Sequence, residues 1–151
     1  MILTLIHNIT LLVALSVIWS PILTLRKNYP NTYRILSGLL FGFSAIAAMM
    51  TPFHFEEDII YDGRSIVIAL AGLFGGGVAS FVASGVAVLY RIYLGGAGVY
   101  AGVASILVSA LLGLAMRRIY KNEPSEIPLF GIIVFAVVTH VMVLSCQLLL
   151  P

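Results

Sequence analysis

Residues 62–98 read DGRSIVIALAGLFGGGVASFVASGVAVLYRIYLGGAG, and this stretch decides the fold. Arg64 and Arg91 bracket 26 residues without a charged side chain, and the run Gly75-Gly76-Gly77 interrupts them. A soluble domain has no use for so long an uncharged segment. A simple membrane anchor has no use for a triple glycine inside it, so the stretch indicates a membrane segment with a built-in break.

The composition of the whole chain places it in a membrane. Of its 151 residues, 61% are hydrophobic and 9% are charged, whereas a globular domain has about 25% charged residues. The length suits one domain, 1–151. The net charge is only +2 and the basic residues sit in short loops, so nucleic acid is not an expected partner. The apolar N-terminus lacks a basic leader and a cleavage site, which predicts a retained helix.

The charge of the loops predicts the number of crossings. Apolar stretches occupy residues 2–25, 33–50, 65–93, 98–116 and 127–150. Basic residues at 26–34 and at 117–121 indicate that both loops are cytoplasmic, so an even number of crossings separates them. A helix over 65–93 would be about 44 Å long, so we expect it to supply two crossings with the break at the glycines. The predicted fold is all-α, integral to the membrane, with six segments, and its N-terminus and acidic loop lie outside.

The depth of the glycine turn has two interpretations. If the third helix begins at Ser65, its ten residues to Phe74 span about 15 Å and end near the midplane. A backbone turn at that depth requires surrounding protein or a water-filled cavity and often marks a binding site. If the helix begins near Ile59, the glycines turn closer to the inner face. The sequence leaves both open.

Small residues recur at helical spacing on two of the predicted helices. They are Gly76, Ser80, Ser84 and Ala87 on the fourth, and Gly98, Gly102, Ser105, Ser109 and Gly113 on the fifth. Such faces let helix backbones approach closely in lipid, and packing explains most of them. Ser105 is the exception, because its hydroxyl is expected about two turns below the outer surface.

No catalytic constellation is visible. His7, His54 and His140 lie on different segments without carboxylates or cysteines at ligand spacing, so no metal site is expected. The glycine run lacks the lysine and the strand of a nucleotide loop. Cys146 is expected to be a small buried hydrophobe. We therefore expect a non-enzyme without a cofactor.

The two arginines carry the strongest chemical signal. Charged groups at a membrane edge mark a ligand path, or else they extend to the interface or pair with a neighbour such as Asp62. A guanidinium is a planar fork of donors that matches a carboxylate or phosphate. Arg64 and Arg91 at the outer ends of adjacent helices would form a positive pocket for a small anion.

The pattern around these arginines resembles the five-transmembrane receptor region of LytS-YhcK type bacterial sensors. That family has an N/D-x-R motif at a helix start, a GL-x-GG turn and an HR-x-x-x-GG motif. These fall here on Asp62 and Arg64, on Gly72, Leu73, Gly75 and Gly76, and on Arg91, Gly95 and Gly96. The similarity is strong over residues 62–113 and looser from about 5 to 150.

The resemblance implies a sensory input domain in a bacterial or archaeal plasma membrane. Such domains are fused to, or act with, a histidine kinase or diguanylate cyclase, and we expect a homodimer or such a fusion. Members with a known ligand sense small extracellular carboxylates such as pyruvate, which implies a site of Arg64, Arg91 and Ser105 flanked by Asp62, Tyr90 and Gly102. The implied fold also resembles the substrate-binding subunits of energy-coupling-factor transporters.

The chain departs from the family pattern at several positions. Gly77 replaces a proline, Tyr90 replaces a histidine, and Gly102 stands where some members have cysteine. The last crossing and the output domain of the family are not seen before Pro151, so we expect a fragment or a stand-alone receptor. Two alternatives remain at this point: a vitamin or small-molecule transporter subunit, and a structural module whose arginines extend to the interface.

Overall fold

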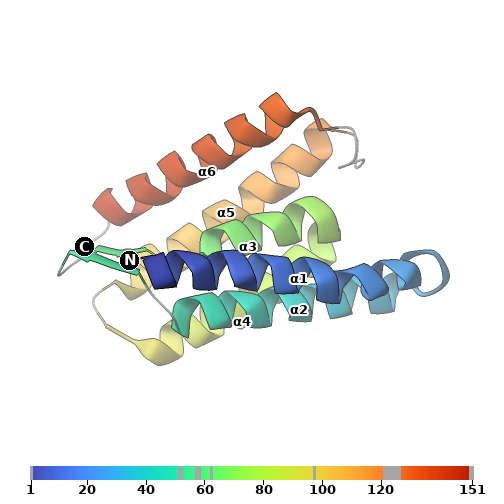
Figure 1. Cartoon of the computed structure of the whole chain (residues 1–151), viewed down its shortest axis with the longest axis horizontal. Coiled ribbons are helices and arrows are strands. Elements are labelled where there is room, and N and C mark those ends of the chain that lie inside the picture. The colour runs from blue at the N-terminus through green and yellow to red at the C-terminus, as the bar shows by residue number, and fades with distance from the viewer. Residues whose placement is uncertain are drawn as a thin grey trace.

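The protein is a bundle of helices with one short strand pair at one end (Figure 1). The computed structural model describes residues 2–50, 53–56, 59–61, 63–96, 98–120 and 127–149. In chain order the elements are α1 (Ile2–Asn28), α2 (Pro30–Met50), β1 (Phe53–Glu56), β2 (Ile59–Tyr61), α3 (Arg64–Leu70), the π-helix η1 (Ala71–Gly75), α4 (Gly76–Leu94), α5 (Val99–Ile119) and α6 (Leu129–Leu149).

Five helical stretches are long and apolar enough to cross a bilayer: Ile9–Asn28, Pro30–Met50, Arg64–Leu94, Val99–Ile119 and Leu129–Leu148. Each has 20 residues or more, which matches a hydrocarbon core of about 30 Å. Only 6% of the first span and 17% of the last are buried by protein. These two outer helices therefore expose most of their apolar side chains, as lipid contact requires, and the chain is a multi-pass membrane protein.

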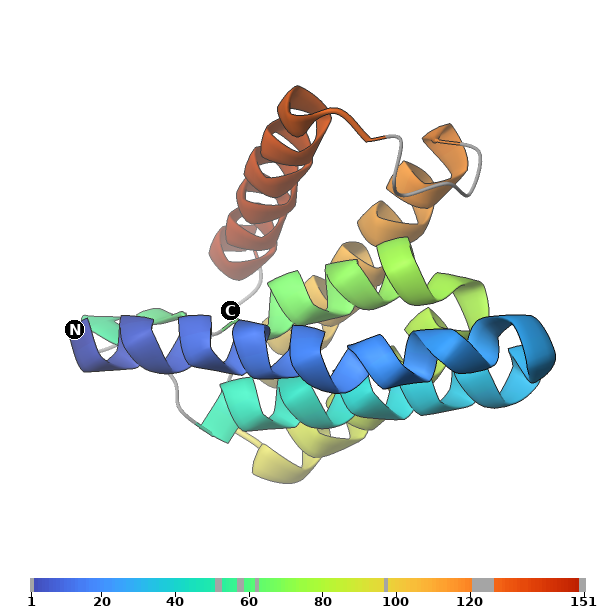
Figure 2. The same ribbon diagram turned by 45° about the vertical axis from the view of Figure 1, so that its right-hand side comes forward.

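The stretch from Arg64 to Leu94 is not one rod. Gly76 ends η1 with φ 82° and ψ −170°, a conformation that is almost confined to glycine. Figures 1 and 2 show that the chain reverses at this turn, so that α3 and α4 form a helical hairpin. The predicted break at the glycines is confirmed.

The two arms of this hairpin are unequal. α4 has 19 residues, whereas α3 and η1 have 7 and 5, which together span about 18 Å at 1.5 Å per residue. The described chain therefore contains five helices of spanning length and one of half length. The six membrane segments expected from loop charge are not confirmed, because the third has only about half the length of a span.

The half-length arm settles the depth of the glycine turn. The third helix starts at Arg64, close to the Ser65 start of the first interpretation. The glycine turn nevertheless lies at the end of the bundle that contains the basic loops, as in the second interpretation. Tyr33 Oη in the first turn of α2 and Arg117 Nη1 in the last turn of α5 both donate to the carbonyl oxygen of Phe74. The two basic loops thus lie at the same end, as the parity argument requires, and the recess is at the other end.

That other end contains a β-hairpin in the acidic loop before Arg64. β1 and β2 pair antiparallel with Phe53 opposite Tyr61 and His54 opposite Ile60, and the register shifts before Glu56. The fold is otherwise helical. The hairpin brings the chain from the end of α2 back to the recessed start of α3.

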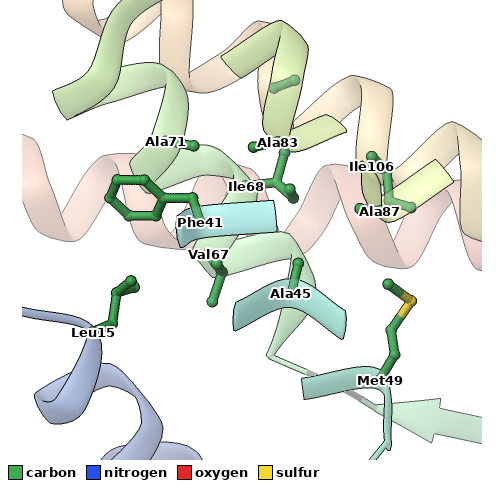
Figure 3. Close-up of a cluster of buried hydrophobic side chains, with 11 residues drawn as sticks. Leu15, Phe41, Ala45, Met49, Val67, Ile68, Ala71, Ala83, Ala87 and Ile106 are labelled. Carbon is green, nitrogen blue, oxygen red and sulfur yellow. The ribbon is translucent and has the colours of Figure 1, made fainter. Parts of the chain in front are cut away.

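The core lies where α2, α3 and α4 meet, with Leu15 contributed by α1 (Figure 3). Five of its eleven members are alanines, and four of these, Ala45, Ala71, Ala83 and Ala87, are fully buried. Glycines extend this close packing, since a Cβ at Gly38 would come within 2.7 Å of Val82. Lipid offers no hydrophobic drive for helix association, so such close van der Waals packing holds the bundle together.

Candidate functional site

Arg64 is the first residue of α3 and lies inside the bundle. It is 8% exposed, although it belongs to the segment nearest the acidic loop. Its Nη2 donates to Ser105 Oγ at 3.4 Å. Ser105 lies six residues into α5, about 9 Å along its axis, which shows how far the start of α3 is recessed.

Ser105 links the arginine to the backbone of α5. It is fully buried, and its hydroxyl donates to the carbonyl oxygen of Gly102 at 2.8 Å. One turn further, Ser109 Oγ donates to the carbonyl oxygen of Ser105 at 2.7 Å. With its own proton committed to the helix, Ser105 Oγ presents its lone pairs to Arg64. The depth of this hydroxyl below the outer membrane surface stays a prediction.

Arg91 reaches the same turn of α5 from the other side. A Cβ built on Gly102 would collide with Arg91 Nε and would come within 3.0 Å of its Cδ, and one on Gly98 would lie 3.2 Å from its Nη2. The arginine stem therefore lies flat over the first turns of α5, where only glycine leaves room. Its Nη1 donates to the carbonyl oxygen of Gly95 at 3.2 Å, beyond the end of α4.

The two arginines thus converge on one turn of α5, between Gly102 and Ser105. All six acidic residues of the chain fall in 56–62 and 123–126, so none lies on the helices that bring the arginines together. Arg91 Nε is buried and has no hydrogen-bond partner among the described residues. A small anion at this turn would be attracted by both positive charges, and most strongly where water is excluded.

The remaining predicted ligand residues are placed differently. Tyr90 is half-buried and packs against the hydrophobic core, with its ring centroid 6.3 Å from that of Tyr93. One residue on a helix turns the side chain by about 100°, so Tyr90 does not follow Arg91 onto α5. Asp62 lies outside the described residues.

The glycines predicted to be structural fall into two groups. Gly76, Gly95 and Gly96 have positive φ and make the turns at the two ends of α4. Gly72 and Gly75 are needed for space: a Cβ on Gly72 would lie 3.0 Å from the Ala110 carbonyl oxygen, and one on Gly75 would lie 2.5 Å from the Ala79 Cβ. Gly77 has neither feature, since its φ is ordinary and nothing lies within 4 Å.

The sequence analysis missed the residues that hold the tip of the hairpin. Arg117 Nη1 donates to the carbonyl oxygens of Leu73 and Phe74 at 2.8 Å each, and Tyr33 Oη donates to Phe74 at 3.3 Å. A signal for Arg117 was present. It lies four residues after Gly113, in line with the small-residue face of α5, whereas the analysis treated it only as a topogenic charge.

The buried face of α4 contacts α5 near both ends of the two helices. Arg91 lies beside Gly102 at one end of the α4–α5 pair, and Gly76 lies beside Arg117 at the other, with a Gly76 Cβ 3.5 Å from Arg117 Cζ. Gly98 and Gly102 of the α5 stripe therefore face α4, whereas Ser105 and Gly113 face the short arm at Arg64 and Ala69. Ser80 and Ser84 lie on the buried face of α4, and their hydroxyls have no partner among the described residues.

Comparison with known proteins gives one match. A family model described as 5TMR of 5TMR-LYT, the five-transmembrane receptor region of LytS-YhcK type sensors, matches residues 16–151. No curated protein and no solved structure matches the chain.

Proposed function

Because the chain belongs to the LytS-YhcK type five-transmembrane receptor family, a family of sensory input regions, we propose that it binds a small anionic solute outside the membrane. The solute is a short carboxylate such as pyruvate. The site consists of Arg64, Arg91 and the Ser105 hydroxyl. The domain passes the signal to a fused or partner kinase or cyclase.

The observation that supports this proposal is the convergence of both arginines on one turn of α5. A carboxylate has two oxygens, and a guanidinium offers paired N–H donors in the matching plane. Arg64 approaches from α3 and Arg91 from α4, so a carboxylate between them would accept hydrogen bonds from both. Ser105 keeps a lone pair toward the site and could turn its proton from the Gly102 carbonyl to the ligand.

The opposing interpretation is that both arginines extend to the lipid headgroups. The burial of Arg64 at 8% exposure and its bond to Ser105 favour an internal role. An interface-seeking arginine would project along the helix toward the outer end. The Arg91 side chain runs from Gly102 toward Gly98 and the Gly95 carbonyl oxygen, so Arg64 alone supports the internal role.

Calorimetric titration of pyruvate and other short carboxylates tests the proposal on the wild type, Arg64→Ala and Arg91→Ala. A charge-assisted hydrogen bond contributes about 1.5–3 kcal/mol, so each variant should bind about 10- to 150-fold more weakly. Arg118→Ala is the matched control, because Arg118 is exposed at the far end of α5. Full affinity in both arginine variants would refute the proposal.

A further inference from the structure

The short α3–η1 arm is attached to α5 at both of its ends. At its first residue, Arg64 bonds Ser105 of α5. At its last residues, the carbonyl oxygens of Leu73 and Phe74 accept from Arg117 of α5. The two attachment points on α5 are 12 residues apart, about 18 Å along its axis, which is close to the length of the arm itself.

Between these points the arm and α5 share buried side-chain clusters, such as Leu73 with Met116, but at two positions the contact is made by backbone. A Cβ on Gly113 of α5 would collide with the Ala69 carbonyl oxygen, and one on Gly72 of the arm would lie 3.0 Å from Leu114 N. Helices normally lock in register because side-chain ridges fill grooves. Gly72 and Gly113 remove these ridges at their own positions, so the contact resists sliding less there than an ordinary helix pair does.

At the inner end of the arm, side chains from other helices satisfy the backbone carbonyl oxygens. The last carbonyls of a helix have no partner within it, and at this tip Arg117 and Tyr33 supply the donors. The last five residues of the arm form the π-helix η1. A π-helix has i→i+5 hydrogen bonds and is often found at functional sites.

We propose that α3–η1 is a coupling rod, which moves along the glycine contact and links the state of Arg64 at one end to the Arg117 attachment at the other. Drawing Arg64 away from Ser105 shifts the first turn of α3. The helical hydrogen bonds of the arm transmit this shift to Leu73 and Phe74, where Arg117 and Tyr33 must adjust. The coupling concerns the two ends of the bundle and goes beyond the binding of any solute.

A double-mutant cycle on the full chain, in detergent or nanodiscs without added ligand, tests the coupling. The outer variant is Ser105→Ala, which removes the acceptor of Arg64, and the inner variant is Arg117→Gln. The readout is the thermal unfolding temperature. Sites this far apart without a shared partner normally give additive effects. Coupling predicts that the unfolding temperature of the double variant falls by less than the sum of the two single decreases. The shortfall should be at least half of the smaller single decrease.

Arg91→Gln combined with Arg117→Gln is the matched control. Arg91 touches the same turn of α5 as Arg64 but belongs to α4, so this pair should be additive. If Arg117→Gln fails to fold, Tyr33→Phe serves as the inner variant, because it removes only the second donor to Phe74. Additive losses in the Ser105 cycle would overturn the proposal. So would a Ser105→Ala variant that unfolds at the wild-type temperature, since the outer attachment would then hold nothing.

Discussion

At the scale of single residues, the proposed site depends on the lack of large side chains at the start of α5 as much as on the arginines. Gly98 and Gly102 leave the space in which the Arg91 stem lies, and Ser105 offers the acceptor for Arg64. A face of glycine and serine therefore brings two guanidinium groups to one turn of a helix. The same residue types would read as packing residues if neither arginine were present.

Gly102→Ala should displace Arg91, because the added methyl group occupies the position of its Nε and Cδ. We expect pyruvate affinity to fall about tenfold, equal to about 1.4 kcal/mol. Gly85→Ala is the control, since a Cβ there meets nothing within 4 Å. Calorimetry on both variants decides the matter, and equal binding would show that the position of Arg91 is irrelevant to the site.

Arg91→Lys separates ligand binding from interface anchoring. Lysine keeps the charge and the apolar stem but lacks the planar fork, so carboxylate binding should weaken by about tenfold or more, the value of a single charge-assisted bond. Arg118→Lys should leave binding unchanged. Titration of the two variants side by side measures the difference, and a fully active Arg91→Lys protein would favour the interface role.

At the scale of elements, the hairpin of α3–η1 and α4 is the feature that distinguishes this bundle from a set of plain spans. Its tip needs one glycine, Gly76, with a backbone conformation that other residues rarely adopt. Close contact between its short arm and α5 needs two more, Gly72 in the arm and Gly113 in α5. The adjacent Gly77 is not required by either criterion. The three glycines of the run therefore differ in how strictly the fold requires them.

Gly76→Ala should destabilise the protein by about 1–3 kcal/mol, because φ 82° with ψ −170° is strained for any residue with a Cβ. Gly77→Ala should be neutral or slightly stabilising, since alanine has the better helix propensity by about 1 kcal/mol. Thermal unfolding of the two purified variants compares them directly. Equal losses would mean that the turn adopts another conformation.

Gly113→Ala tests the contact between the short arm and α5. Its Cβ would collide with the Ala69 carbonyl oxygen, so the helices must separate, and overpacking of this kind costs about 1–3 kcal/mol. The control is again Gly85→Ala, an exposed helical glycine. A Gly113→Ala protein as stable as the control would show that α3 is free to move away from α5.

At the scale of the whole molecule, the half-length arm keeps both basic loops at one end of the bundle. Tyr33 and Arg117, one beside each loop, both bond Phe74 at the tip of the hairpin. Figure 1 shows α1 beginning and α6 ending at the opposite end, together with the β-hairpin. The arginine site is recessed at that end.

The positive-inside rule predicts that the end with the basic loops is cytoplasmic. Single cysteines at Asn28 and Asn122, in a Cys146→Ser background, should react with a membrane-impermeant thiol reagent only from the inside. A cysteine at Glu57 should react only from the outside. Labelling of position 57 from the cytoplasmic side would invert the topology and would place the arginine site on the inner face.

The sequence by itself determined the membrane class, the helices and the break at the glycines, and it singled out the two arginines as candidate ligand residues. Each of these depends on composition, on spacing or on one residue type. Only the tertiary structure decided that the third segment is half a span, that Arg91 lies over Gly102 while Tyr90 turns into the core, and that Arg117 holds the tip. These features depend on the register between helices, which small residues permit but do not encode. Steric fit between α3, α4 and α5 sets that register, and it exists only once all three are packed.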